Sequence, residues 1–308
     1  MAEITASMVK ELRDKTGAGM MDCKKALAET GGDLEKAVDE LRKRGQAIAN
    51  KRGGRAMKEG LIVAKTAGSV GALIELNAET DFVTRNEEFR ALAQALADAV
   101  FAAGPALPAG DMEHATQLPL AQYGGKTVAE TITALIGKIG ENMAFSRFIR
   151  YEAKNDAGAG SITAYIHPPG KLGVMLELEA GKAETLGREA FVTLARDLAM
   201  HVAAAAPVSL NREDVPAALV ARERAIYADS DELKSKPEAI RERIIDGKMG
   251  KFFKQSVLLE QEFVKDPDQS IAKLVESVGK QLGDTIKVAR FARFVVGQTS
   301  EAEGEAAE

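Results

Sequence analysis

The sequence predicts an α+β fold, in which a small helical N-terminal module precedes a duplicated core of strands and helices with a helical hairpin insertion. Three observations carry this prediction. Apolar residues recur at helical spacing over residues 5–45. From residue 60 onward, strand-like alternation and helical spacing succeed each other. Finally, the pattern of residues 71–100 returns 102 positions later, over residues 173–202, which marks an internal repeat.

Residues 1–45 are expected to form a compact module of three short helices that docks on a partner. Thr5 can cap the first helix, and Gly17 follows it as a stop. Asp33 can cap the third helix, which we expect to end at Gly45. The apolar stripe of that helix is Leu34, Ala37, Val38 and Leu41. A module of this size has a marginal core of its own.

Residues 46–59 are predicted to be a basic linker, although their first part can extend the third helix. The stretch holds Lys51, Arg52, Arg55 and Lys58 around two glycines and few large apolar residues. The alternative is an RNA-associated adaptor that uses the basic segment 42–58. This segment has no aromatic side chain to stack on bases, and the chain carries a net charge of −5. We therefore expect no nucleic-acid partner.

Residues 60–151 are predicted to form the first core subdomain. Residues 61–64 and 72–76 alternate as paired strands around a turn at Gly68, and a helix is expected over residues 84–101. Its inward face is Phe89, Leu92, Leu96 and Val100. Thr127 and Glu130 form a capping box for a second helix that runs through Ile139, and residues 144–151 close the unit as a strand.

Residues 152–296 are predicted to be a second copy of this subdomain. The matching pairs are Gly71 and Gly173, Glu75 and Glu177, Leu76 and Leu178, Phe89 and Phe191, Leu92 and Leu194, Leu96 and Leu198, and Val100 and Val202. The closing strands are also alike, over residues 143–148 and 286–291. These matches fall on inward positions of strands and helices, so they predict two structurally equivalent units.

The two copies differ at the turn between strand and helix. The first copy has Thr80-Asp81-Phe82-Val83, whereas the second has Lys182-Ala183-Glu184-Thr185. If the fold required an apolar residue at Phe82, the duplicate would need one too, and it has Glu184. Phe82 is therefore predicted to be an exposed wedge rather than a core residue, and turns of this kind often present functional groups.

A helical hairpin is predicted as an insertion at about residues 215–255 of the second copy. Leu219, Ile226 and Leu233 lie seven residues apart, like a coiled-coil seam, and Ser235-Lys236-Pro237 makes a turn. The sequence does not decide whether the hairpin projects from the core or packs against it. Whether two chains pair through the hairpin also stays open. A helix after Asp266-Pro267 leads to a strand over residues 285–296, and the acidic tail 297–308 is expected to be disordered.

Few residues offer chemistry for an enzyme, a metal or a cofactor. The three histidines are far apart, and Cys23 lies on an apolar helix face. Gly125-Lys126-Thr127 is half of a phosphate-binding loop without its first glycine, and is better explained as a helix start. A signal peptide and a run of about 18 apolar residues are both missing, so we expect a cytoplasmic protein without a membrane partner.

Four stretches resemble the elongation factor Ts family, the guanine-nucleotide exchange factors for elongation factor Tu. They are LRDKTGAGMMDCKKAL at residues 12–27, Thr80-Asp81-Phe82-Val83, Lys138-Ile139-Gly140-Glu141-Asn142, and Met200-His201-Val202-Ala203-Ala204. The resemblance implies a ubiquitin-associated-like N-terminal module, the duplicated core and the helical hairpin. It also implies a translation elongation factor that is not an enzyme and has no cofactor.

The resemblance implies roles for individual residues as well. Thr80, Asp81, Phe82 and Val83 would push between two helices of the nucleotide-binding domain of elongation factor Tu and disturb its Mg²⁺ site. Ile139 and Gly140 would touch the partner beside the wedge, Met20 and Met21 would belong to the docking surface, and His167 would contact the partner from the second copy. In longer family members a C-terminal helix also touches the partner, and we do not expect the acidic residues 298–308 of this chain to form one. A homodimer or a 2:2 complex with the partner stays open.

Overall fold

The computed structural model describes residues 4–153, 159–230 and 236–298 of the chain. Two three-stranded antiparallel sheets form its centre. The first has the order β1-β2-β5, with β1 at Glu59–Ala67, β2 at Val70–Ala78 and β5 at Met143–Glu152. The second has the order β10-β7-β6, with β6 at Ala159–His167, β7 at Leu172–Ala180 and β10 at Ile286–Val295. The predicted strand pairing across the Gly68 turn is confirmed.

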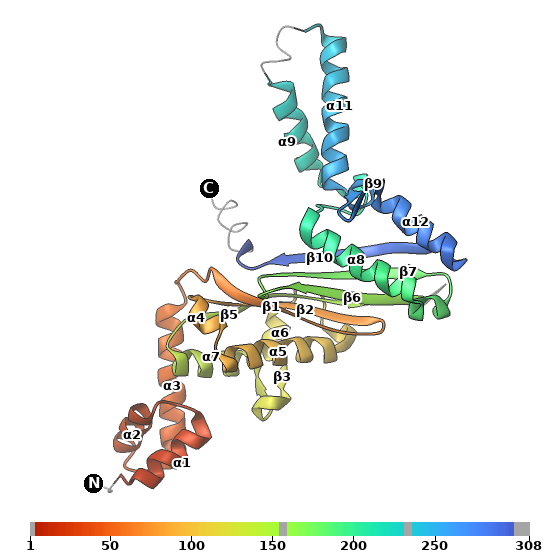
Figure 1. Ribbon diagram of the computed structural model, residues 1–308. Coiled ribbons are helices and arrows are strands. Elements are labelled where there is room, and N and C mark those ends of the chain that lie inside the picture. The colour runs from red at the N-terminus through yellow and green to blue at the C-terminus, as the bar shows by residue number, and fades with distance from the viewer. Residues whose placement is uncertain (1–3, 154–158, 231–235, 299–308) are drawn as a thin grey trace.

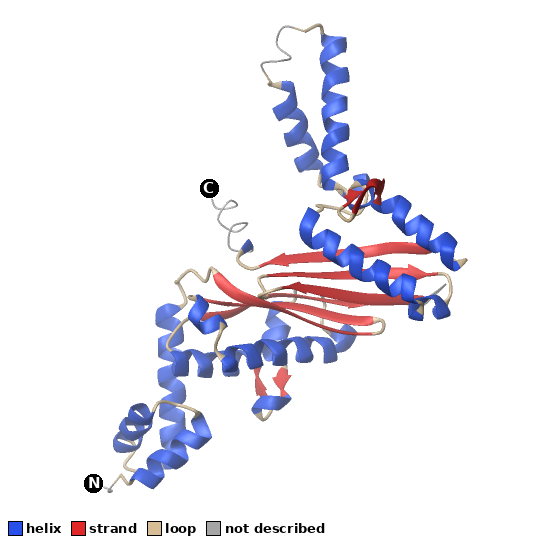
Figure 2. Cartoon of the chain, in the orientation of Figure 1, coloured by secondary structure: helices blue, strands red, loops and turns tan. Residues whose placement is uncertain are grey.

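Helices cover the outer face of each sheet, and the inner faces of the two sheets pack on each other (Figure 1, Figure 2). The covering helices are α5 (Glu87–Ala102) and α7 (Val128–Ile139) for the first sheet, and α8 (Glu189–Ala205) and α12 (Ile271–Leu282) for the second. Alternation along β2 explains the layers, since Ile74 packs with the helices whereas Leu73 packs with the other sheet. The predicted α+β class is confirmed.

Short elements complete the two subdomains. They are α4 (Asp81–Thr84), the 3₁₀ turns Gly104–Ala106, Ala121–Tyr123, Ala183–Gly187, Arg212–Asp214 and Leu258–Glu260, α6 (Met112–Gln117), β3 (Pro119–Leu120), β4 (Lys126–Thr127), β8 (Glu262–Phe263) and β9 (Asp266–Ser270). The capping box of α7 forms as predicted, because Thr127 accepts from the backbone of Glu130 while the Glu130 carboxylate accepts from that of Thr127.

The internal repeat appears in the structure down to an irregularity of the strands. Helices α5 and α8 begin 102 positions apart, at Glu87 and Glu189. Each sheet also has a bulge at the equivalent place: Ser146 is skipped in β5 opposite β2, and Ala289 is skipped in β10 opposite β7. Bulges bend strands at defined positions, so both copies share the same local twist.

A cross-strand ion pair with a buried carboxylate lies on the inner face of each sheet, at equivalent positions. Glu75 pairs with Arg147 Nε at 2.7 Å, and Glu177 pairs with Arg290 Nε at 2.5 Å. Each arginine also reaches the other copy, because Arg147 donates to Val295 O and Arg290 donates to Glu152 O. The reciprocal contacts mean that each subdomain completes the hydrogen bonding of its duplicate.

Aromatic rings flank these arginines, again reciprocally. The Arg147 guanidinium lies 4.1 Å from the ring centroid of Phe294, and the Arg290 guanidinium lies 4.1 Å from that of Tyr151. Burial between the sheets raises the pKa of Tyr151 to about 12. The interface therefore combines apolar packing with a small number of well-partnered charges.

The N-terminal module consists of α1 (Ala6–Thr16), α2 (Met20–Glu29) and α3 (Leu34–Arg52). The caps predicted at Thr5 and Asp33 form. The third helix does not end at Gly45 but continues to Arg52, so the extension into the first part of the predicted linker is confirmed. Gly45 instead allows a close helix crossing, because a Cβ on Gly137 of α7 would lie 3.1 Å from the Cα of Gly45.

The predicted start of the helix at residue 84 is also wrong. Helix α5 begins at Glu87, because the side chain of Asn86 accepts from the backbone N–H of Glu88 and caps it. Thr84 belongs to the preceding turn, where its hydroxyl donates to Asp81 O at 2.8 Å. The short helix α4 therefore stands apart from α5 as a separate unit.

The insertion is a helical hairpin of α9 (Ala217–Ala228) and α11 (Glu238–Ser256), and it projects away from the core (Figure 1). The predicted seam is wrong, since Ile226 is exposed while Val220 and Tyr227 pack against Ile245 and Met249. Val220 and Tyr227 are also seven residues apart, so spacing alone could not choose between the two faces. The predicted seam residue Leu233, the first residue of the predicted turn (Ser235) and the tail beyond residue 298 lie outside the described residues.

Replacing either of the equivalent glycines, Gly71 and Gly173, by alanine should push the two sheets apart locally. A Cβ at Gly71 would lie 2.4 Å from Ile162 Cγ2, and one at Gly173 would lie 2.5 Å from Ile62 Cγ2. We expect Gly71→Ala and Gly173→Ala each to lower the free energy of unfolding by about 1–3 kcal/mol, as overpacking does. Urea denaturation measures this. Gly187→Ala is the control, because its Cβ would meet open space, and equal losses at all three positions would contradict the packing argument.

Candidate functional site

The wedge segment (residues 80–83) lies at the end of β2, where the chain turns into the one-turn helix α4. Phe82 is 77% exposed, whereas the next residue, Val83, is only 3% exposed. Thr84 is buried too, and its backbone carbonyl accepts from Arg90 Nε at 3.1 Å. The buried residues Val83 and Thr84 thus anchor the turn in the core, while Phe82 extends into solvent. The predicted exposure of Phe82 is confirmed.

The second copy shows that the fold itself turns the position of Phe82 toward solvent and the position of Val83 toward the core. Thr185, the equivalent of Val83, is buried, and Glu184, the equivalent of Phe82, is exposed. A large aromatic side chain at the outward position is therefore not needed for packing. It is available for contact with another molecule.

Asp81 lies beside Phe82 and forms an ion pair with Arg85 at 2.7 Å. Both side chains are largely exposed, at 42% for Asp81 and 71% for Arg85. Exposed pairs at this helical spacing contribute only about 0.3–0.5 kcal/mol. Asp81 can therefore exchange Arg85 for a new polar partner at little cost.

The turn after α7 lies next to the wedge segment. Gly140 ends α7 with φ of 78°, a conformation that favours glycine, and its N–H donates to Ile136 O. Two hydrogen bonds then connect the following residues to the wedge: Thr80 donates to Glu141, and Asn142 N donates to Glu79. The structure thus brings Gly140 and Ile139 beside the wedge, with both residues half-buried and Ile139 also packed against the core.

The other predicted contact residues lie farther from the wedge. Met20 and Met21 are exposed on α2, at 58% and 76%, so neither belongs to the core of the N-terminal module. His167 is exposed at the end of β6, where its Nδ1 lies 2.9 Å from the Tyr165 hydroxyl. Its turn rests on β1, because Ile62 N donates to Gly170 O at 2.7 Å. Ile62 pairs with Glu75 of β2, so the turn after His167 lies near the end of β2, from which the wedge segment follows.

A family profile described as Elongation factor TS matches residues 79–298. Elongation factor Ts of Trichlorobacter lovleyi is 44% identical over 297 residues, which cover 96% of this chain and 93% of that protein. That of Syntrophotalea carbinolica is 45% identical over 296 residues, with 96% and 94% covered. That of Magnetococcus marinus is 43% identical over 302 residues, with 98% and 95% covered. The chain belongs to the elongation factor Ts family. It is therefore a translation elongation factor.

The remaining histidines of this elongation factor have local partners. His201, in the stretch Met200 to Ala204, is fully buried, and its Nε2 lies 2.9 Å from Gln261 Oε1. Its Nδ1 accepts from Val264 N at 3.3 Å, which makes Nε2 the protonated nitrogen. His114 is exposed and contacts Asp111. Burial raises the pKa of the Cys23 thiol, so this group is not an activated nucleophile.

Three arginines of the basic segment 42–58 pair with carboxylates. Arg42 pairs with Glu130, Arg44 pairs with Glu29 and Glu40, and Arg55 pairs with Glu79. Arg42 thereby connects α3 to α7 and Arg44 connects it to α2, and fewer cations are left for phosphate groups. The RNA-binding alternative thus gains no support from the described side chains.

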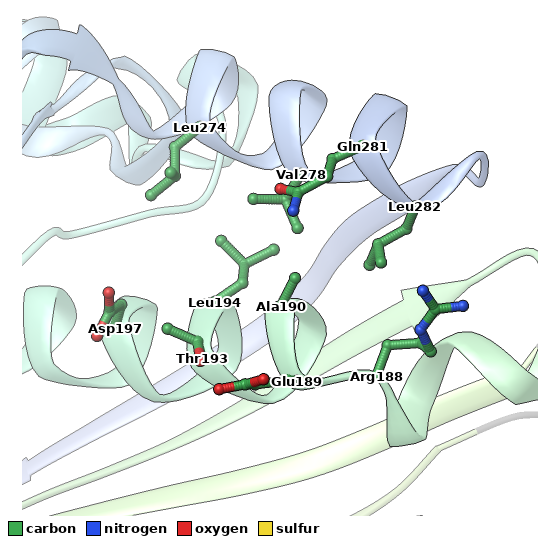
Figure 3. Close-up of a pocket in the computed structure, with 10 residues that line it drawn as sticks. All are labelled: Arg188, Glu189, Ala190, Thr193, Leu194, Asp197, Leu274, Val278, Gln281 and Leu282. Atoms are coloured by element: carbon green, nitrogen blue, oxygen red, sulfur yellow. The ribbon is translucent and has the colours of Figure 1, made fainter.

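A pocket of about 580 Å³ lies between α8 and α12, far along the chain from the wedge (Figure 3). Half of its lining residues are aliphatic, and the other half are polar or charged, among them Arg188, Glu189 and Asp197. Among the described residues, no group of three or more His, Cys, Asp or Glu side chains could hold a metal ion. None of the described helices is long and apolar enough to span a membrane.

Truncating the side chains of Phe82 and Val83 to alanine should have different effects on the free energy of unfolding. Because Phe82 is exposed and Val83 is buried, we expect Phe82→Ala to change the free energy of unfolding little. Val83→Ala should lower it by about 1–3 kcal/mol through a cavity. Urea denaturation of both variants tests this, and a large loss on Phe82→Ala would show that the aromatic ring packs on its own chain.

His201 should make stability depend on pH. Burial lowers its pKa, outweighing the hydrogen bond to Gln261, which raises it. The unfolded chain, with a histidine pKa near about 6.5, then binds more protons than the folded chain. This contribution is fully present above about pH 6.5 and is lost as pH falls through the folded-state value. Urea denaturation from about pH 7.5 to about pH 5 should show a smaller pH slope for His201→Gln than for wild type, and an unchanged slope would contradict the argument.

Proposed function

We propose that this chain binds elongation factor Tu in its GDP-bound form and promotes GDP release by disturbing the Mg²⁺ site, after which GTP rebinds. One observation carries the proposal: in a member of this family, an anchored turn holds a 77%-exposed Phe82 next to the carboxylate of Asp81. Thr80 and Val83 complete the turn. The names of the relatives support the same assignment.

Phe82 supplies the driving force in this mechanism. Moving its ring from water into an apolar site between two helices of the partner gains roughly 1.5–3 kcal/mol. The anchoring of Val83 and Thr84 keeps the turn in place during insertion, so little of this gain is lost in ordering the segment. The gain is available to displace partner residues that hold the metal ion.

Asp81 supplies the electrostatic part. A bound Mg²⁺ is held by a few oxygen ligands and neutralises the nucleotide phosphates. A carboxylate brought near those ligands competes for their hydrogen bonds and changes the local potential. Once the ion leaves, the diphosphate is repelled by its surroundings and dissociates. No covalent bond is made or broken, so the chain acts as an exchange factor and not as an enzyme.

Additional contacts give affinity without disturbing the metal. Met20 and Met21 offer adaptable apolar side chains on the N-terminal module. Ile139 and Gly140 extend the surface beside the wedge, and His167 adds a polar contact from the second copy. Because coupling is reciprocal, nucleotide must weaken the binding of this chain to the partner as much as the chain weakens the binding of nucleotide.

Phe82→Ala should slow GDP release strongly. Losing roughly 1.5–3 kcal/mol of insertion energy corresponds to a rate roughly 10- to 100-fold lower. Stopped-flow fluorescence of labelled GDP leaving elongation factor Tu measures this. Glu184→Ala is the matched control at the equivalent position of the second copy and should act like wild type. If wild type itself does not speed release, the exchange function is wrong. If Phe82→Ala equals wild type, only the wedge mechanism is wrong.

A further inference from the structure

Glu79 lies directly before the wedge segment and connects three parts of the chain. Its side chain is only 14% exposed. One carboxylate oxygen accepts from Asn142 N at 2.7 Å, and the other accepts from Arg55 Nη1 at 3.0 Å. Glu79 therefore joins the end of β2 to the turn after α7 and to the segment that follows α3.

Glu141 makes the complementary connection. Its carboxylate accepts from the hydroxyl of Thr80 at 2.9 Å. Two hydrogen bonds thus join the segments: the Glu79 carboxylate binds residue 142, and the Glu141 carboxylate binds residue 80. Each segment supplies one of the two carboxylates. Because Phe82 lies two residues after Thr80 and Gly140 immediately precedes Glu141, the two contact elements cannot shift independently while both links hold.

Arg55 connects this network to the N-terminal module. It follows α3, which crosses α7 closely at Gly45 and Gly137. Helix α7 in turn ends at Gly140, beside the wedge. The docking module, the turn after α7 and the wedge segment are therefore connected through one set of contacts.

The second copy lacks the reciprocal arrangement. There, Asp284 stands where the first copy has Glu141, and it accepts from Lys182 N at 3.0 Å and from the Thr185 hydroxyl at 2.6 Å. Glycine stands at position 181, the equivalent of Glu79, so no side chain can reach back. Among the described side chains, two carboxylates hold the turn that carries Phe82, whereas one carboxylate holds the equivalent turn of the second copy.

We propose that Glu79 and Glu141 are positioning residues for nucleotide exchange, which lock the wedge segment to the turn after α7 so that Phe82 and Gly140 meet the partner as one rigid surface. This inference rests on the proposed exchange function. The Phe82 ring can displace residues of the partner only if the segment that carries it stays in place. Small misplacements of such a group lower the reaction rate more than they lower the binding affinity. Separated contacts on α2 can still hold the partner when the wedge is loose.

The test measures GDP release from elongation factor Tu against the concentration of this chain, for Glu79→Ala and Glu141→Ala. We expect the maximal release rate at saturation to fall roughly tenfold, while the concentration that gives half of it changes little. Glu79→Gln and Glu141→Gln should restore most of the rate, because the amide oxygen still accepts from Asn142 N or from the Thr80 hydroxyl.

Asp284→Ala is the matched control, since it removes the equivalent link in the copy without a wedge and should leave the maximal rate unchanged. Wild-type rates for the two alanine variants would overturn the inference, and so would an equal loss on Asp284→Ala or a failure of both glutamine variants to restore the rate. These results differ from a failure of the proposed function, in which wild type does not speed release and Phe82→Ala changes nothing. In that case the inference falls with it.

Discussion

The packing of the two sheets on each other is the constraint on which the rest of this structure depends. Glu75 and Glu177 are buried between the sheets, and taking a carboxylate out of water costs several kcal/mol unless a partner compensates it. Arg147 and Arg290 provide that compensation only in one register, because a shift by one residue would turn both carboxylates toward the helices. Polar cross-links thus specify an arrangement that apolar residues alone would leave less defined.

The wedge inherits its position from this arrangement. β2 carries Glu75 in the sheet interface and ends at Ala78, two residues before Thr80. The strand is therefore fixed in register immediately before the chain turns outward. A single exposed aromatic ring is ordinary on a protein surface. Phe82 is informative because a rigid strand, a buried Val83 and two carboxylates hold it there, whereas the duplicate presents a charged residue at the same point.

The duplication made much of the fold predictable from the sequence. Residues that repeat, such as Phe89 and Phe191, are those that the core requires, so their spacing located both sheets and both long helices. Local signals failed where a distant neighbour decides the outcome: Gly45 resembles a helix stop until α7 lies against it. The roles of Glu79 and Glu141 were not predictable for the same reason, since their hydrogen bonds join segments about 60 residues apart in sequence.

The sizes of the energies fit the proposed exchange function, in which one side chain supplies most of the driving force. Coupling between two ligands of one protein is typically about 1–3 kcal/mol. Burial of one phenylalanine supplies a similar amount. A larger apolar wedge would hold the partner too tightly for a returning nucleotide to displace it, because the coupling acts equally in both directions. The remaining surface can then supply affinity from exposed residues such as Met20 and Met21 without opposing nucleotide return. A duplicated scaffold suits this division, because one copy carries the wedge while the other braces it through the shared sheet interface.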